Sequence, residues 1–395
     1  MSTPSTLFAD IREELATLEA HARLRKLRAT SPLPGVYIDV AGRRMLDLSS
    51  NDYLGFASNV EMLARFQAEQ RDGDLGRCSG GSTASRLLSG NRPVADALEG
   101  AVGQAYGRTA LLFNSGYHAN IGTVSALAGQ GDLVLLDRLC HASIIDGVRL
   151  SGARWLRYRH GDMQHLESLL QNKVEGARRI FVVSESIFSM DGDCADVSAL
   201  VRLKEQYGAV LILDEAHAVG VRGSRGLGVA EEAGLLDRVD ILVGTLGKAY
   251  GSMGAFVVAS EDVCSYLINS ARSFIFSTGL PPHVHAWSLA TWHSALEADS
   301  ARMHLRELAA RFREALVAAG IRTGGDSQIV PVIVGSDAAA VATAAALQAE
   351  GYWVLPIRPP TVPPNTARLR FTLCANMQWD ALAPIIPVIK KALSQ

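Results

Sequence analysis

The stretch VLILDEAHAVG, residues 210–220, decides the fold because a short apolar run in it ends at several ionisable side chains. Residues 210–213 have the length and composition of a buried strand, and Asp214 and His217 follow directly. Ionisable groups there are costly unless they have partners, and parallel α/β sheets bind ligands beyond the carboxyl ends of their strands. The stretch therefore predicts a ligand site at a sheet edge. A cap at Asp214 with a surface His217 is the alternative.

Five more apolar runs have the features of buried strands. They are residues 110–113, 133–136, 180–183, 241–243 and 255–258. Stretches of helical length lie between most of them, and this alternation is typical of an α/β layer with a largely parallel sheet. The first four of these runs, like residues 210–213, end at polar side chains able to take part in catalysis. We therefore expect one functional edge shared by five strands.

The N-terminal segment predicts a helix and a short β pair. Leu15, Leu18, Ala22 and Arg25 recur at helical spacing, so we expect an amphipathic helix over the first thirty residues. The sequence SPLPG at 31–35 then ends it. The β-like runs that follow are residues 36–40 and 45–48.

The alternation of strand-like and helical stretches stops after the two prolines at 281–282. Beyond them we expect one long helical stretch, several β-like runs and an alanine-rich helix. These segments are the stretch to about residue 320, the runs 329–334, 353–357 and 369–373, and the helix 338–347. The chain therefore predicts an N-terminal part at 1–50, a large α/β domain at 51–285 and a smaller α+β domain at 286–395.

Composition excludes several classes of protein. The 395 residues are 48% hydrophobic and 20% charged, which rules out disorder, collagen and coiled coil as descriptions of the whole chain. A net charge of −2 gives no general field for nucleic acid or an anionic membrane. No run approaches 18 apolar residues. We therefore expect neither nucleic acid nor a membrane as a partner.

The cysteines indicate a reducing compartment. The five are Cys78, Cys140, Cys194, Cys264 and Cys374, and no pair has C-x-x-C spacing. This excludes a disulfide framework and a zinc ribbon, and we expect small, mostly buried side chains and no metal site. The first ten residues lack the basic and apolar regions of a signal peptide. The expected location is the cytoplasm.

Two of the strand-end loops suggest particular chemistry. Lys248 lies between glycines just after residues 241–243, and a lysine in a partly apolar site has a lowered pKa that favours Schiff-base formation. Gly116 opens a helical stretch after Asn114 and Ser115, where backbone N–H groups can bind a phosphate. A flexible loop with an exposed lysine and an ordinary tight turn are the respective alternatives.

The sequence excludes one nucleotide-dependent class of protein and disfavours another. The string DEAH occurs in a class of helicases, but these need a phosphate loop of the form G-x-x-x-x-G-K-[ST]. The comparable string has Leu242 in place of the first glycine and Ala249 in place of the hydroxyl residue. No G-x-G-x-x-G follows a strand in a βαβ unit, which disfavours a nicotinamide enzyme.

Pyridoxal 5′-phosphate (PLP) fits the set of strand-end residues. This cofactor needs a lysine for a Schiff base and an acid opposite its pyridinium nitrogen. It also needs donors for its phosphate and a flat group over its ring. Lys248, Asp214, the loops of Gly116 and Thr245, and His141 supply these in kind.

The whole of residues 24–393 resembles the α-oxoamine synthases, PLP enzymes of fold type I, the aspartate-aminotransferase fold. Nine strings carry the resemblance. They are SSNDYLGF (49–56), GGSTASRLLSGN (80–91), FNSGYHAN (113–120), HASIIDG (141–147), ESIFSMDGD (185–193), DEAHAVG (214–220), GTLGKAYG (244–251), FIFSTGLPP (274–282) and IRPPTVPPNTARLRFTL (357–373). The resemblance implies a large, mostly parallel-sheet domain followed by a small C-terminal one.

The resemblance also implies roles around the cofactor. Lys248 would form the Schiff base, Asp214 would pair with the pyridinium nitrogen and His217 with the phenolic oxygen. His141 would stack on the ring. The remaining cofactor contacts would come from Ser189 and, at the phosphate, from Gly116, Tyr117 and Thr245.

Further implied contacts concern the partner subunit and the substrates. Thr278, with Ser277, would reach the phosphate of a neighbouring subunit, which implies a homodimer with sites at its interface. Arg358 would hold the amino-acid carboxylate, as a bidentate guanidinium can. The other implied substrate contacts are Arg25, Asn51 and Thr361.

The segment IRPPTVP at 357–363 is most similar to the biotin-pathway branch of the family. That branch implies L-alanine and a pimeloyl thioester of coenzyme A or acyl carrier protein as substrates. The products would be 8-amino-7-oxononanoate, CO2 and the free thiol.

Other activities remain open at this point. Glycine C-acetyltransferase, 5-aminolevulinate synthase, serine palmitoyltransferase and acyl-aminoketone signal synthases share the central residues Lys248, Asp214, His217 and His141. A non-catalytic PLP-fold partner subunit and an aminotransferase are alternatives of other kinds. The first of these would be expected to lack Lys248 or Asp214.

Overall fold

The computed structural model describes residues 6–72 and 80–394, so Cys78 lies outside the described residues. It divides into two compact units. Unit 1 comprises Met1–Ser50, Met190–Gly192 and Arg306–Gln395, and unit 2 comprises Asn51–Ser189 and Asp193–Leu305. The N-terminal fifty residues thus share a unit with the C-terminal segment.

Unit 2 is built on a seven-stranded sheet in the order β4-β10-β9-β8-β7-β5-β6. Only β10 runs antiparallel to its neighbours, so the expected α/β fold with a mostly parallel sheet is confirmed. The strands are β4 (Thr109–Phe113), β5 (Leu133–Asp137), β6 (Arg154–Tyr158), β7 (Ile180–Glu185), β8 (Val210–Asp214), β9 (Ile241–Thr245) and β10 (Ala255–Ala259).

One strand, β6, has no counterpart in the sequence prediction. Its sequence RWLRY contains two arginines, and only Tyr158 is buried. It pairs with β5 alone, at the edge of the sheet, where one side of the strand has no neighbour to cover it. An apolar run, the signal that identified the other strands, is therefore missing here.

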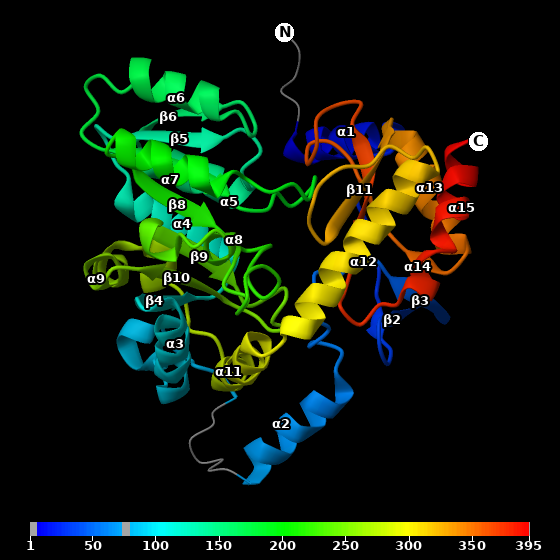
Figure 1. The fold of residues 1–395 in the computed structure, drawn as a ribbon, viewed down its shortest axis with the longest axis horizontal. Helices are drawn as coiled ribbons and strands as arrows, with labels where there is room; N and C mark the ends of the chain where they lie inside the picture. Colours follow the sequence, from blue (N-terminus) through cyan, green and yellow to red (C-terminus); the bar gives the residue numbers. More distant parts are fainter. Residues whose placement is uncertain (1–5, 73–79, 395) are drawn as a thin grey trace. The chain divides into compact units, whose positions relative to one another are not determined.

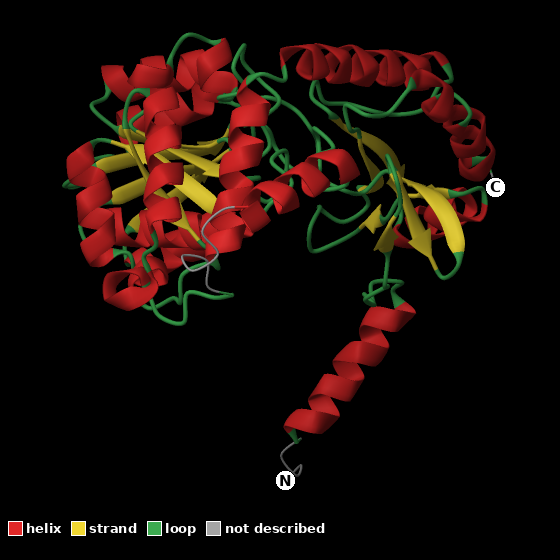
Figure 2. Cartoon of the chain, turned by 90° about the horizontal axis from the view of Figure 1, so that it is seen from below, coloured by secondary structure: helices red, strands yellow, loops and turns green. Residues whose placement is uncertain are grey.

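Helices cover both faces of this sheet (Figures 1 and 2). On one face, an apolar cluster joins β5 residues such as Val134 and Leu136 to Ile144 and Val148 of α5. On the other, Trp292 of α11 stacks on Tyr250 with ring centroids 5.2 Å apart. The helical elements are α2 (Val60–Asp72), η2 (Arg86–Gly90), α3 (Pro93–Tyr106), α4 (Gly116–Leu127), α5 (Ala142–Ser151), α6 (Met163–Asn172), α7 (Val197–Gln206), α8 (Val229–Glu232), η3 (Leu236–Arg238), α9 (Glu261–Ser270), α10 (Arg272–Ile275) and α11 (Pro282–Leu296).

Unit 1 contains a four-stranded sheet, β1-β2-β3-β12, and a three-stranded sheet, β11-β14-β13. Parallel pairing of β12 with β3 joins the N-terminal segment to the C-terminal segment, with Tyr352 opposite Leu46. The strands are β1 (Ser31–Pro32), β2 (Tyr37–Val40), β3 (Arg43–Asp47), β11 (Ile329–Gly335), β12 (Tyr352–Trp353), β13 (Pro356–Ile357) and β14 (Ala367–Thr372). Its helices are α1 (Leu7–Ala20), α13 (Asp337–Ala349), α14 (Trp379–Leu382) and α15 (Ile385–Leu393), and α12 (Asp299–Ala318) begins in unit 2.

The N-terminal helix is shorter than predicted. It ends at Ala20, and Ala22 has a positive φ of 54°, so the expected helix over thirty residues is wrong. Beyond it, Arg23 forms an ion pair with Asp337 on α13 at 2.6 Å. From there to β1 the chain forms neither helix nor strand, and Arg28 in this segment donates to Gln348 of α13 at 2.9 Å. The single helical stretch expected after residues 281–282 is likewise two helices, α11 and α12.

In the part of the chain that the structure describes, no helix has the length and apolar character needed to cross a membrane. Among residues 6–72 and 80–394, no group of three His, Cys, Asp or Glu side chains is arranged to hold a metal ion.

Two glycines with positive φ provide a matched test of packing. Gly251 follows Lys248 and has φ +57°, and a Cβ there would lie 2.4 Å from the backbone nitrogen of Ala57. Gly208 has φ +62° and open space around it. Gly208→Ala should cost roughly 1 kcal/mol of backbone strain, and Gly251→Ala about 2 kcal/mol more because backbone atoms must move. Calorimetric unfolding of both variants checks this, and equal losses would contradict it.

Candidate active site

Lys248 lies on the loop after β9, and its Nζ is 3.0 Å from Nε2 of His217, on the loop after β8. β8 and β9 are adjacent parallel strands. Their loops therefore leave the sheet at the same edge, which brings the two side chains together. An amine that donates to an imidazole nitrogen is held in one direction.

A buried tyrosine holds the other side of this imidazole. The hydroxyl of Tyr53 lies 2.6 Å from Nδ1 of His217 and 3.2 Å from Oδ1 of Asn51. Both ring nitrogens of His217 thus have partners, which fixes the orientation of the ring. Tyr53 received no role from the sequence, although it lies in the string SSNDYLGF, because its burial and its contact with His217 appear only in the structure.

Asp214 ends β8 and is also buried. Its carboxylate accepts hydrogen bonds from Nδ2 of Asn120 at 2.7 Å and from the backbone N–H of Ala216 at 2.8 Å. Asn120 lies on α4 and also donates to Oγ of Ser143, 3.0 Å away on α5. Ser143 Oγ is in turn 2.7 Å from Nδ1 of His141. A continuous chain of buried polar groups therefore links Asp214 to His141.

Two carboxyl groups, those of Glu185 and Asp214, lie on paired residues of adjacent strands at this edge. Burial, and next the Asp214 carboxylate, raise the pKa of Glu185 well above its ordinary range. Glu185 accepts the backbone N–H of His141 at 2.6 Å. Burial lowers the pKa of His141, and the nearby Lys248 adds to this while Asp214 opposes it. A neutral His141 also caps α5, accepting the backbone N–H of Ser143 at 3.2 Å.

The N-terminus of α4 lies beside the end of β9. Ser115 caps this helix, and the next residue, Gly116, would bring a Cβ within 3.9 Å of Thr245 and of no other residue. Thr245 Oγ1 donates to the carbonyl oxygen of Gly254 at 3.1 Å. A twelve-residue helix that begins without a side chain in the way suits an anion.

Two predicted phosphate contacts lie at the periphery of this site. The Tyr117 hydroxyl donates to Asp146, and this hydrogen bond raises the pKa of Tyr117. Thr278 is exposed and forms a β-bridge with Ser85, while its carbonyl oxygen accepts Nδ2 of Asn114 at 2.7 Å. Ser189 lies half-buried on the loop after β7.

The arrangement in unit 2 fits PLP on its own geometry. Asp214 is a buried carboxylate with lone pairs to spare beyond its two donors, as a pyridinium nitrogen requires. Lys248 is an amine in contact with an imidazole, and His141 is a neutral flat ring. Gly116 leaves the α4 N-terminus open for a phosphate.

Three predicted substrate contacts, Arg25, Arg358 and Thr361, gather in unit 1 instead. Arg25 Nη2 donates to Thr361 Oγ1 at 3.0 Å, and Arg358 donates to the carbonyl oxygen of Ala22. Burial lowers the pKa of Arg358, and the Arg25 charge adds to this. Asn51, the fourth predicted contact, belongs to unit 2 with Lys248.

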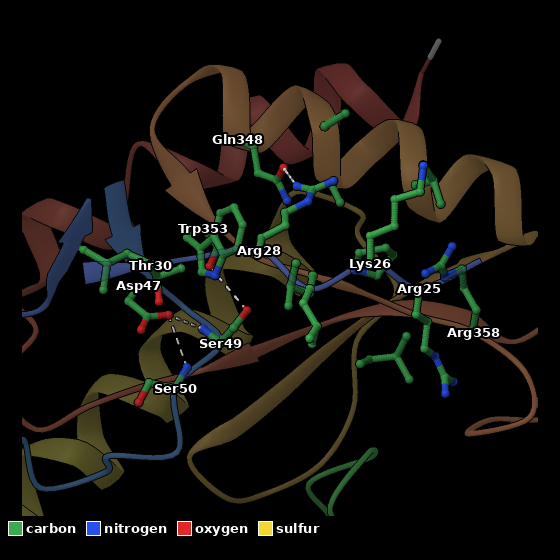
Figure 3. A pocket seen from close by; sticks show the side chains of 18 of the residues that line it. Arg25, Lys26, Arg28, Thr30, Asp47, Ser49, Ser50, Gln348, Trp353 and Arg358 are labelled. Carbon is green, nitrogen blue, oxygen red and sulfur yellow. Dashed lines mark hydrogen bonds between the residues drawn. The ribbon is translucent and has the colours of Figure 1, made fainter. Parts of the chain in front are cut away.

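Arg25 and Arg358 line one end of a cavity of about 760 Å³ within unit 1 (Figure 3). Lys26 and Arg28 also line it, and Arg28 is held by Gln348 at 2.9 Å. Within the described residues, none of these four cations forms an ion pair with a carboxylate. The wall includes apolar side chains such as Val341, so the cavity suits an anion attached to an apolar group.

Comparison with known proteins decides the family. The model of the family "Aminotransferase class I and II" matches residues 43–389. The chain belongs to this family. Its fold is therefore that of the PLP-dependent aminotransferases.

Three similar proteins represent two kinds of enzyme. An 8-amino-7-oxononanoate synthase of Chlorobaculum parvum is 53% identical over 94% of this chain and 96% of its own length. A solved serine palmitoyltransferase of S. paucimobilis, with a bound PLP–myriocin aldimine, is 29% identical with a TM-score of 0.89, covering 98% of this chain and 97% of its own. An 8-amino-7-oxononanoate synthase of Francisella tularensis is 26% identical with a TM-score of 0.73, over 89% and 98%.

These findings confirm four of the expectations. The fold-type-I architecture, the family resemblance, PLP as the cofactor and a PLP-dependent acyltransferase as the class of enzyme are all correct. The individual site residues, the homodimer and the amino-acid substrate remain predictions.

Asn120 offers a test of the polar chain behind Asp214. Asn120→Ala leaves the buried Asp214 carboxylate without its side-chain donor, which makes its ionised form less stable. We expect the dissociation constant for PLP, measured by absorbance titration of the apoprotein, to rise roughly tenfold. Asn172→Ala, which removes an exposed amide at the end of α6, is the control and should bind PLP like the unmodified protein. Equal affinities in the two variants would contradict the role of Asn120.

Proposed function

We propose that the protein condenses L-alanine with a pimeloyl thioester in the cytoplasm, as a step of biotin synthesis. The new C–C bond joins the alanine α-carbon to the acyl carbonyl, and the thiol and CO2 leave to give 8-amino-7-oxononanoate. The observation that carries this proposal is the 53% identity to the Chlorobaculum parvum enzyme of that name over 94% of the chain.

The cofactor supplies the electron-withdrawing ring that accepts the negative charge of a substrate carbanion. Asp214 would pair with the ring nitrogen and keep it protonated, since its buried carboxylate is held in place by Asn120 and the backbone N–H of Ala216. His217, fixed by Tyr53 on its other side, would orient the phenolic oxygen. Gly116 and Thr245 would hold the phosphate, with Tyr117 and Ser189 as further contacts.

Proton transfer would fall to Lys248. Its Nζ is the amine nearest His217, and it would take the α-proton of alanine and later return a proton to the product carbon. His141 would lie flat against the cofactor and exclude water from that face. A neutral imidazole suits this role because it carries no charge against the ring.

The substrate carboxylate would be bound by Arg358, whose guanidinium offers paired donors. Arg25, Thr361 and Asn51 would complete the substrate contacts. Among the described residues, the four cations that line the cavity of unit 1 form no ion pair with a carboxylate, which supports the binding of anionic substrates there. Thr278 would reach the phosphate of a second subunit, and the active form would be a homodimer.

Serine palmitoyltransferase is the second candidate. The TM-score of 0.89 to the S. paucimobilis enzyme exceeds the 0.73 to the Francisella tularensis synthase and favours it. Its acyl substrate has no terminal carboxylate, whereas a pimeloyl chain has one. The two candidate functions thus differ in the amino-acid substrate and in the acyl substrate.

A competition assay distinguishes the two. The PLP-loaded protein is offered L-alanine, glycine or L-serine with pimeloyl-CoA, acetyl-CoA or palmitoyl-CoA, and the products are identified by mass spectrometry. We expect alanine with pimeloyl-CoA to give 8-amino-7-oxononanoate faster than any other pair. Serine with palmitoyl-CoA as the fastest pair would assign the second candidate. If no CoA thioester releases thiol, the assay is repeated with pimeloyl-acyl carrier protein.

Lys248 is the residue on which turnover should depend most. Lys248→Ala removes both the covalent attachment of the cofactor and the proton carrier, so thiol release and the visible absorbance of bound PLP should both disappear. Lys173→Ala, at an exposed position after α6, is the control and should retain both. Near-normal turnover in Lys248→Ala would exclude the proposed role.

A further inference from the structure

A histidine is held between two carboxylates at neighbouring strand ends of unit 2. His160 follows β6, and its Nδ1 is 2.9 Å from Oδ1 of Asp137, at the end of β5. Its Nε2 is 2.8 Å from Oδ2 of Asp193, which follows β7. The three residues thus come from three adjacent strand ends of unit 2, and none of them has a role in the chemistry described above.

This geometry requires a charged imidazole. A carboxylate accepts hydrogen bonds and donates none, so both ring nitrogens of His160 must carry a proton. The hydrogen bonds with Asp137 and Asp193 outweigh the opposing effect of burial and raise the pKa of His160 to about 10. The ring of Phe188 packs against the same imidazole in an edge-to-face arrangement, with centroids 4.4 Å apart.

One carboxylate connects His160 to the loop of His141. Asp137 is buried, and besides the imidazole it accepts the backbone N–H groups of Leu139 at 2.8 Å and Gly161 at 2.9 Å. Leu139 lies two residues before His141. The position of Asp137 therefore fixes the turn that delivers His141 to the edge of the sheet.

The other carboxylate connects His160 to the loop of Ser189. The backbone carbonyl of Asp193 accepts the N–H of Phe188 at 3.0 Å, and Ile187 forms a β-bridge with Cys194. Asp193 therefore closes the base of the loop that carries Ser189. Its side chain has one ion-pair partner among the described residues, which is His160.

We propose that His160 is a positioning residue, whose imidazolium ties the His141 loop to the Ser189 loop and so sets the cofactor site. The inference rests on the cofactor contacts proposed for His141 and Ser189. His160 itself would touch neither cofactor nor substrate. Among described residues, the charged groups bonded to it are Asp137 and Asp193, while the adjacent Arg159 is paired with Asp162 at 2.7 Å.

Two substitutions on different loops test the proposal. His160→Gln removes the positive charge of the ring but keeps a hydrogen-bond donor. Asp193→Asn weakens only the contact between His160 and the loop that carries Ser189. Displacement of the two loops should raise the dissociation constant for PLP roughly tenfold in each variant. The double variant should be no weaker than the single ones, because both changes break the same link. His293→Gln, at an exposed position on α11, is the control.

The titration uses apoprotein and PLP alone, so its result does not depend on which amino acid or thioester the enzyme takes. Unchanged PLP affinity in both variants, with only a lowered melting temperature, would assign His160 a purely structural role and overturn the proposal. If His160→Gln does not fold, the PLP affinity of Asp193→Asn is compared with that of the unmodified protein.

A spectroscopic measurement on the unmodified apoprotein tests the charge directly. In ¹⁵N-histidine-labelled protein at pH 8, both ring nitrogens of His160 should carry protons, and a neutral ring would overturn the proposal. Because the pKa of His160 is raised on folding, its contribution to stability should be complete below about pH 6.5 and lost as the pH rises through about 10. The stability difference between the unmodified protein and His160→Gln should shrink over that range.

Discussion

The carboxyl edge of four adjacent parallel strands is the constraint on which this molecule depends. β5, β7, β8 and β9 all end there, and their last or following residues include Asp137, Glu185, Asp214 and Lys248. Groups of this kind are tolerated in a buried place only with partners. Asn120, reaching in from α4, supplies one of those partners. The same hydrogen bonds would therefore stabilise the sheet edge and hold the groups that we propose for catalysis.

Much of the fold could be predicted from the sequence because its strands are short, apolar and separated by helices. The exceptions have physical reasons. β6 has a neighbouring strand on one side only, and its two arginines interrupt the apolar run that identified the other strands. The segment after α1 is held by Arg23, whose partner Asp337 is more than 300 residues away. The grouping of both chain ends in one unit rests on the parallel pair of Leu46 with Tyr352, and such long-range pairing leaves no local signal.

Some residues of the candidate site could be predicted from the sequence, and others could not. Residues directly after a strand, such as Asp214, His217 and Lys248, could be found from position alone, since their loops meet at one edge. Asn120 and Ser143 could not, because each lies inside a helix where a buried polar side chain resembles any other. His160 and Tyr53 were equally hidden, since their roles appear only in the distances to their partners. Supporting residues are thus harder to predict than the groups they support.

We infer a covalent link between PLP and Lys248 at this edge. It can be tested by reducing the PLP-loaded protein with borohydride, which fixes the cofactor to the amine that it is linked to, and sequencing the labelled peptide by mass spectrometry. We expect one phosphopyridoxyl group per chain, on Lys248. A label on another lysine, or no label at stoichiometric PLP, would contradict it.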